Sequence, residues 1–151
     1  MGIMKLHLFQ DIIYAGFADP CSWSDYTALL EALSTLVLRE NSSMLNAEEF
    51  ISAGTWDADS EFSLEKCIPA FFGVTCPAEH YPERLQPFIL QAGDYLFSQF
   101  SDSSSRGITA AAEDARMELY HRNWNPSGNT VFLRGIREES LWKLQLLIHL
   151  I

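Results

Sequence analysis

The chain is poor in basic side chains and in cysteine, and it has no long apolar run. Ten Lys and Arg stand against twenty Asp and Glu, which gives a formal net charge of −10 at pH 7. Because a nucleic-acid interface needs cations that neutralise phosphates, this balance argues against direct nucleic-acid binding. No apolar stretch reaches the roughly 18 residues of a membrane span, and no basic region with a long apolar core opens the chain. We therefore expect no membrane partner and no signal peptide.

Other absences exclude several kinds of site. Cys21, Cys67 and Cys76 are odd in number and fit no metal-finger spacing, which favours reduced thiols in a cytoplasmic protein. The chain has no glycine-rich phosphate loop, no Rossmann fingerprint and no Gly-Xaa-Ser-Xaa-Gly elbow. We expect no metal and no cofactor.

The chain does contain an internal repeat. An apolar run, an amphipathic helix and two strand-like segments follow one another twice within 151 residues. The first copy consists of a strand within 5–18, a helix from Ser22 to about Arg39, and strands at 50–56 and 68–75. The second consists of a strand at 88–97, a helix with the apolar stripe Ile108, Ala111, Ala112, Ala115 and Leu119, and strands at 131–137 and 142–151.

This order predicts an α+β fold of the type βαββ–βαββ, with two helices on one face of an antiparallel sheet. The connection at 77–87 is too short for a flexible tether. We therefore expect a single domain over 1–151, made of repeats at about 4–76 and 88–151 that share one core.

With this order the chain resembles the GyrI-like family, also called gyrase-inhibitor-like or effector-binding domains. The local likeness lies in an aromatic-Gly-Val strand and a later segment similar to Pro-Ala-Gly-Xaa-Tyr, with Gln in place of Pro. These are Phe71-Phe72-Gly73-Val74 and Leu90-Gln91-Ala92-Gly93-Asp94-Tyr95-Leu96-Phe97. The resemblance implies a small-molecule-binding module whose cleft lies between the two halves and is lined by aromatic side chains, often with a carboxylate at its base.

At one position the chain departs from that family. The strand that usually carries the pocket carboxylate holds Leu133 and Arg134, and Glu138 lies four to five residues beyond. A preference for cations is therefore not implied. Arg134 could instead orient a carboxylate or a phosphate through its planar fork of donors.

Aromatic side chains on the expected strands are the candidates for the cleft. Tyr and Trp combine a large apolar face with one hydrogen-bonding tip, which suits flat ligands, although each is also an ordinary core residue. The candidate ligand-binding residues are Tyr14, Trp56, Phe72, Tyr95, Arg134, Glu138 and Trp142.

The remaining polar clusters favour structural roles. An acidic loop lacks the glycine turn of a calcium site, His80 with Glu83 has no second histidine nearby, and His149 stands among apolar neighbours in the last strand. The acidic loop contains Asp57, Asp59, Glu61 and Glu65.

Three functions remain open from the sequence. The first is a stand-alone protein that senses or sequesters an aromatic or amphipathic small molecule. The second is a hydrolase in the same cleft, with Glu138 as the candidate base. The third is an interaction module whose acidic surface meets a basic protein partner.

Overall fold

The computed structural model of the protein confirms the α+β fold. It describes residues 2–17, 23, 26, 28–31, 49–56, 61–63, 67, 69–75, 85–139 and 141–151. These residues form one antiparallel sheet of 8 strands in the order β1-β6-β8-β7-β3-β4-β2-β5. The strands are β1 (Ile3–Leu8), β2 (Ile12–Phe17), β3 (Glu49–Thr55), β4 (Pro69–Thr75), β5 (Gln86–Leu90), β6 (Gly93–Phe100), β7 (Thr130–Glu138) and β8 (Leu141–His149).

Each repeat opens with two strands where the sequence predicts one. β1 pairs with β6, whereas β2 pairs with β5 and with β4. The bend between β5 and β6 uses Gly93, whose φ of +137° is accessible to glycine but not to most residues. Across the bend the Asp11 carboxylate accepts a hydrogen bond from the Ala92 N–H at 2.7 Å. The prediction of one continuous strand in each place was wrong, because the short segments Phe9-Gln10-Asp11 and Gln91-Ala92 each interrupt an otherwise apolar run and separate two strands.

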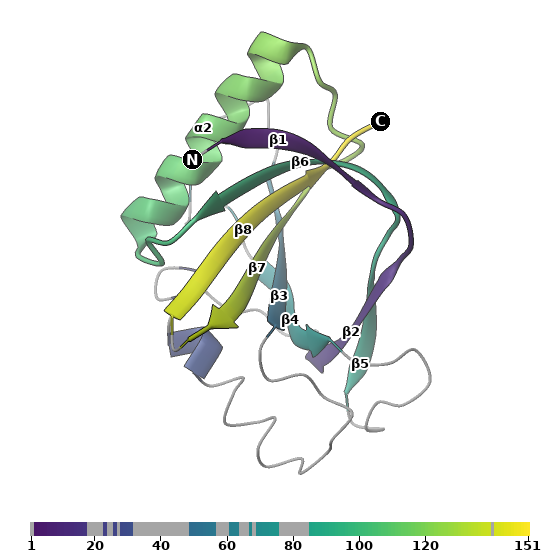
Figure 1. Ribbon diagram of the computed structural model, residues 1–151, viewed down its shortest axis with the longest axis vertical. Helices are drawn as coiled ribbons and strands as arrows, with labels where there is room; N and C mark the ends of the chain where they lie inside the picture. The colour runs from purple at the N-terminus through teal and green to yellow at the C-terminus, as the bar shows by residue number, and fades with distance from the viewer. Residues whose placement is uncertain are drawn as a thin grey trace.

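The bent strands curl the sheet. β1 and β2 together pair with β6 and β5, so this ribbon joins β8 on one side to β4 on the other. Figure 1 shows the ribbon closing the sheet around an interior, with α2 outside it. The sheet therefore has an outer face towards the helices and an inner face within the curl.

Helix α2 (Ser105–Arg122) is capped at both ends. The Ser104 side chain accepts a hydrogen bond from the Gly107 N–H, and Asn123 ends the helix with a left-handed φ of 55°. The predicted stripe from Ile108 to Leu119 is buried against the sheet. Its three alanines allow a close approach of the helix to the strands.

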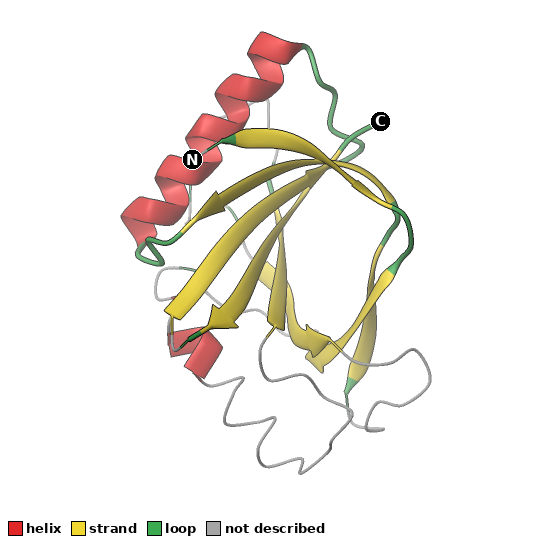
Figure 2. Cartoon of the chain, in the orientation of Figure 1, coloured by secondary structure: helices red, strands yellow, loops and turns green. Residues whose placement is uncertain are grey.

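Helical residues of the first repeat lie on the same outer face. Tyr26 and residues 28–31 are helical, and the remainder of the helix expected at 22–39 lies outside the described residues. The Tyr26 hydroxyl donates to the Leu133 carbonyl at 2.8 Å, and Trp23 Nε1–H donates to Ser52 Oγ at 2.8 Å. Figure 2 shows both helical segments, in red, outside the curl of the sheet.

Two apolar clusters correspond to the two faces. The outer cluster joins Trp23, Tyr26 and Leu30 with the stripe of α2 and with alternate strand residues such as Phe50 and Leu133. The inner cluster takes the other strand positions and contains no residue of α2. Its buried members are Tyr14, Ile51, Ala53, Phe71, Leu90, Tyr95, Phe132 and Leu147.

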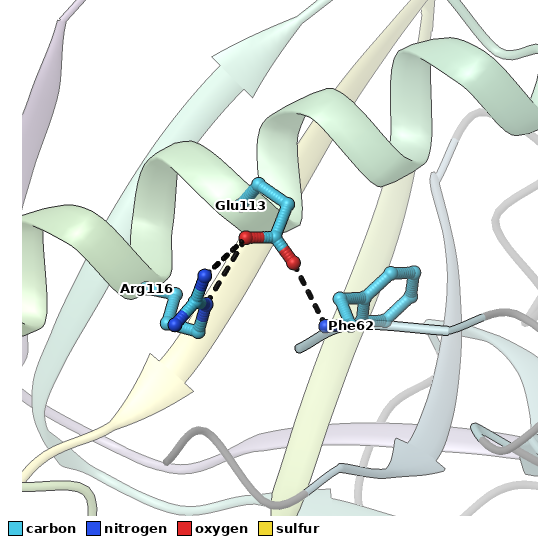
Figure 3. Close-up of polar contacts among 3 residues, drawn as sticks. All are labelled: Phe62, Glu113 and Arg116. Atoms are coloured by element: carbon cyan, nitrogen blue, oxygen red, sulfur yellow. Dashed lines mark hydrogen bonds and ion pairs between the residues drawn. The ribbon is translucent and has the colours of Figure 1, made fainter. Parts of the chain in front are cut away.

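Glu113 of α2 anchors the segment at Phe62 to the outer face (Figure 3). Its carboxylate accepts the Phe62 N–H at 2.8 Å and is held on its other side by the Arg116 guanidinium at 2.8 Å. Burial raises the pKa of Glu113, but the Phe62 N–H and Arg116 outweigh burial, so the pKa lies below its ordinary value.

We expect Glu113→Gln to destabilise the fold by about 1 kcal/mol at neutral pH, because the ionised carboxylate is the stronger acceptor. The folded-state pKa is depressed, so this stabilisation is complete above the unfolded pKa and is lost as pH falls through the folded one. Urea unfolding of both proteins at pH 7 and near pH 4 measures the difference, which should shrink at the lower pH. Asp114→Asn, an exposed neighbour on α2, is the matched control and should change stability little. A loss that is independent of pH would contradict this role for the carboxylate.

Candidate functional site

The inner face is organised in three levels along β6, β7 and β8. Successive residues of one face are two positions apart, or about 7 Å along a strand. The strand register places an outermost pair, then an apolar level, and then a polar level. These levels are Tyr95 with His149; Phe97, Leu147 and Phe132; and Gln99, Gln145 and Arg134.

The polar level continues onto β3 as a row of four side chains, Glu49, Arg134, Gln145 and Gln99, here called the polar row. Arg134 Nε donates to Gln145 Oε1 at 2.7 Å, and Arg134 Nη1 lies 3.6 Å from Glu49 Oε1. Gln145 in turn donates from Nε2 to Gln99 Oε1 at 3.3 Å. Arg134 is only 8% exposed, so its charge depends on these partners in place of water.

Tyr14 joins the polar row from β2. Its hydroxyl donates to Glu49 Oε1 at 3.2 Å. Burial raises the pKa of the Tyr14 phenol, and the Glu49 carboxylate raises it further, against the opposing effect of Arg134. The phenol therefore remains protonated and serves Glu49 as a donor.

Aromatic rings fill the inner face between β4, β5 and β7. Phe71 and Phe88 stack with ring centroids 4.7 Å apart, and Phe132 lies 5.9 Å from Phe88 and 6.2 Å from Tyr95. Such offset and edge-on pairs present flat apolar walls. This packing buries Phe71 and Phe132, and Phe132 and Tyr95 also line a cavity.

A small cavity opens beside the outermost level. Its volume is about 170 Å³, and this cavity with its lining is here called the mouth. Burial, and secondarily the charge of Asp11, raise the pKa of Tyr95 to about 12, so this ring too remains neutral at physiological pH. The lining residues are Ile89, Gln91, Tyr95, Ser127, Gly128, Thr130, Phe132 and His149.

Three of the residues predicted for the ligand site meet on the inner face. Tyr14, Tyr95 and Arg134 belong to the inner cluster or to the polar row. Trp56, Phe72 and Trp142 instead pack in or against the outer cluster. The difference follows from strand alternation, since Phe72 and Phe71 are neighbours in β4 and point to opposite faces.

Glu138 lies apart from both groups. It ends β7, its side chain is 53% exposed, and its carboxylate pairs with Lys143 Nζ at 2.7 Å. Inner-face residues that the sequence prediction did not include are Phe71, Phe88, Phe132 and Glu49. Period-two alternation from Arg134 indicates Phe132, but Glu49 is identified only by its long-range pairing.

The cysteines and acidic residues named from the sequence lie at different places in the fold. Cys67 is buried in the outer cluster, and Glu61 is exposed. Within the described part of the chain, no group of three or more His, Cys, Asp or Glu could hold a metal ion, and no helix is long and apolar enough to cross a membrane. The following lie outside the described residues: Cys21, Cys76, Asp57, Asp59, Glu65, His80 and Glu83.

The curled sheet with helices on its outer face is shared with several proteins of known structure. SAV2435, solved bound to tetraphenylphosphonium, aligns over 100% of this chain and 94% of its own, with a TM-score of 0.66 and 7% identity. The C-terminal domain of EcmrR aligns over 100% and 99%, with a TM-score of 0.67 and 12% identity. A hydrolase encoded by lin2189 from Listeria innocua aligns over 99% and 91%, with a TM-score of 0.57 and 7% identity.

No protein-family model and no curated protein matches the chain in sequence. At identities this low, the structural likeness establishes the fold. It is a fold that has been solved with a small molecule bound.

Proposed function

We propose that this protein is a GyrI-like domain that binds a small aromatic or amphipathic molecule on the inner face of its sheet. The observation that carries the proposal is the buried Arg134 guanidinium, held by Gln145 and Glu49 next to the aromatic rings of the inner face. Apolar packing alone needs no guanidinium there, and burying one is costly unless its partners are positioned for it. Aromatic walls with a few fixed polar groups are the usual composition of a small-molecule site.

The size of the mouth limits the ligand. About 170 Å³ is below the roughly 300–1,000 Å³ of drug-sized pockets but close to the ~150 Å³ that accommodates benzene. We infer that a single ring enters beside Tyr95 and Phe132. A larger ligand would need the stack of Phe88 on Phe71 to move.

The polar row lies one level beyond Phe132, about 7 Å further along β7, so it bears on the charge of a ligand whose polar end extends past the apolar level. Glu49 and Arg134 carry opposite charges 3.6 Å apart, so together they present no net charge. An anion that approached Arg134 would also approach Glu49, and a cation would meet the reverse conflict. We therefore propose a neutral or zwitterionic ligand, in place of the carboxylate or phosphate that Arg134 alone suggests.

A matched probe series tests this site. 2-Phenylethanol, phenylacetate and 2-phenylethylammonium share one ring and differ in charge. The neutral probe should raise the melting temperature most, because either charged probe meets a like charge in the polar row. A ligand at a hundred times its dissociation constant stabilises the native state by about 2.7 kcal/mol. For a domain of this size that is a shift of roughly 5–10 °C.

Two tryptophan substitutions locate the binding. Ile89 is 50% exposed and lines the mouth, so Ile89→Trp should fill the cavity and remove the shift without harming the core. Leu141→Trp places the same side chain at a position that is 73% exposed and away from the mouth, and it should leave the shift unchanged. Equal shifts in both variants, or no shift with any probe, would count against the site.

A further inference from the structure

A serine and a histidine meet at the mouth in the geometry of a nucleophile and its base. Ser127 Oγ lies 2.7 Å from His149 Nδ1, and both residues line the cavity together with Tyr95 and Phe132. We propose that Ser127 and His149 form a catalytic dyad that hydrolyses small esters with an apolar or aromatic acyl group. The proposal rests on the proposed function only in that the mouth holds the acyl group.

Backbone pairing holds the two side chains together. The Ser127 N–H donates to the His149 carbonyl at 2.8 Å, and the Ile151 N–H donates to the Asn125 carbonyl at 2.9 Å. Pro126 and Leu150 form an antiparallel bridge between these two hydrogen bonds. Ser127 and His149 are therefore neighbours across two paired segments, which positions them more rigidly than a contact between two loose loops.

The imidazole ring is fixed on two further sides. The centroid of the His149 ring lies 4.8 Å from that of the Tyr95 ring, and the two residues are direct partners in the pairing of β6 with β8. On another side, a Cβ added to Gly93 would lie only 2.8 Å from His149 Nε2. For Nδ1 to accept the Ser127 proton, the neutral ring must carry its own proton on Nε2.

A donor for the developing oxyanion follows the serine. The Gly128 N–H has no hydrogen-bond acceptor among the described residues, and the space where a Cβ of Gly128 would lie is open. Serine hydrolases commonly use the N–H of the residue after the nucleophile for this purpose. Ser127 is exposed, so a carbonyl carbon can reach it from the mouth.

The reaction proceeds in two balanced steps. Ser127 Oγ attacks the ester carbonyl carbon while its proton passes to His149 Nδ1, and the alcohol then leaves with that proton as the acyl–oxygen bond breaks. Water next attacks the acyl-serine and gives its proton to His149, which returns it to the departing Ser127 oxygen. The products are one alcohol and one carboxylic acid. No carboxylate among the described residues bonds to Nε2, so we expect slower turnover than a full triad gives.

Hydrolysis of p-nitrophenyl butyrate tests the dyad. The wild-type protein should release p-nitrophenol with an initial burst, and Ser127→Ala and His149→Asn should each lower the rate by at least ~100-fold. Ser101→Ala, which removes an exposed serine away from the mouth, is the matched control and should retain the full rate. A fluorophosphonate should form one phosphonate ester, with loss of fluoride, on the peptide that contains Ser127.

Two results would overturn the dyad. One is hydrolysis that survives Ser127→Ala, because the nucleophile would then be the imidazole or another group. The other is absence of phosphonate on Ser127 in protein whose melting temperature shows that it is folded. Ligand binding is measured separately, as the thermal shift of the wild-type protein with 2-phenylethanol, which has no ester bond and cannot acylate Ser127. Labelling of Ser127 without any shift would retain the dyad and reject the binding proposal.

Discussion

Arg134→Met should destabilise the protein by about 2–3 kcal/mol, because it removes the buried partner of an ion pair and leaves the partly buried Glu49 carboxylate without compensation. Arg134 is 8% exposed, and its loss takes the opposite charge from Glu49 and the donor from Gln145 Oε1. Glu49 keeps the Tyr14 hydrogen bond and some exposure to water, so the expected loss lies at or below the lower end of the roughly 3–5 kcal/mol range for buried pairs. Urea unfolding at pH 7 measures it.

Arg122→Met is the control for this substitution. Arg122 pairs with Glu118 at 2.7 Å but is 53% exposed, and exposed ion pairs contribute only about 0–1 kcal/mol. The double variant Glu49→Gln with Arg134→Met should recover part of the lost stability, because the unpaired carboxylate is gone. Equal losses in Arg122→Met and Arg134→Met would show that the polar row is not a buried charge network.

Arg134→Met should also change which probe charge the site prefers. With Arg134 removed, Glu49 is the only charge of the polar row, so 2-phenylethylammonium should bind better than it does to the wild-type protein and phenylacetate should bind worse. Glu49→Gln should do the opposite. If neither substitution altered the ranking of the probes, their binding would lie away from the polar row.

Gly16→Ala should cost about 3 kcal/mol or more, or prevent folding, because overpacking against backbone cannot be relieved by a rotamer change. A Cβ on Gly16 would lie 2.0 Å from the Phe72 carbonyl oxygen and 2.4 Å from Gly73 Cα. Gly16 and Gly73 are direct partners in β2 and β4, so both strands would have to separate. Circular dichroism and urea unfolding report the loss.

Gly128→Ala provides the comparison for Gly16→Ala. Nothing lies within 4 Å of its added Cβ, so stability should stay within about 0.5 kcal/mol of wild type. A small loss in Gly16→Ala, similar to that of Gly128→Ala, would contradict the close approach of β2 to β4.

Local patterns predict much of this fold. The helical stripe of α2, the strands β3, β4, β7 and β8, and the α+β order follow from apolar periodicity and from the stops at polar turns. The two bends do not, because each interruption is only two or three residues long within a mostly apolar run, and it is the pairing with different strands on either side that makes it a bend.

The site was less predictable for a related reason. Residue type identifies aromatic candidates, but the face on which each lies depends on strand parity, so Phe72 and Trp142 were grouped with Tyr14 although they lie on the opposite face. Parity relative to Arg134 is enough to identify Phe132. The contact between Glu49 and Arg134 depends on the register of β3 against β7, which no local pattern encodes.

The bent ribbon makes the two halves of the chain depend on each other. β1 is hydrogen-bonded to β6, and β5 to β2, so each half of the chain contributes a strand to the sheet of the other. A fragment that ended near residue 76 would have unsatisfied strand edges on β1 and β2, and a second copy of the fragment could supply the missing partners. This is the exchange that links subunits in swapped dimers. In the single chain the two halves supply these partners to each other, so neither of these strand edges is left open.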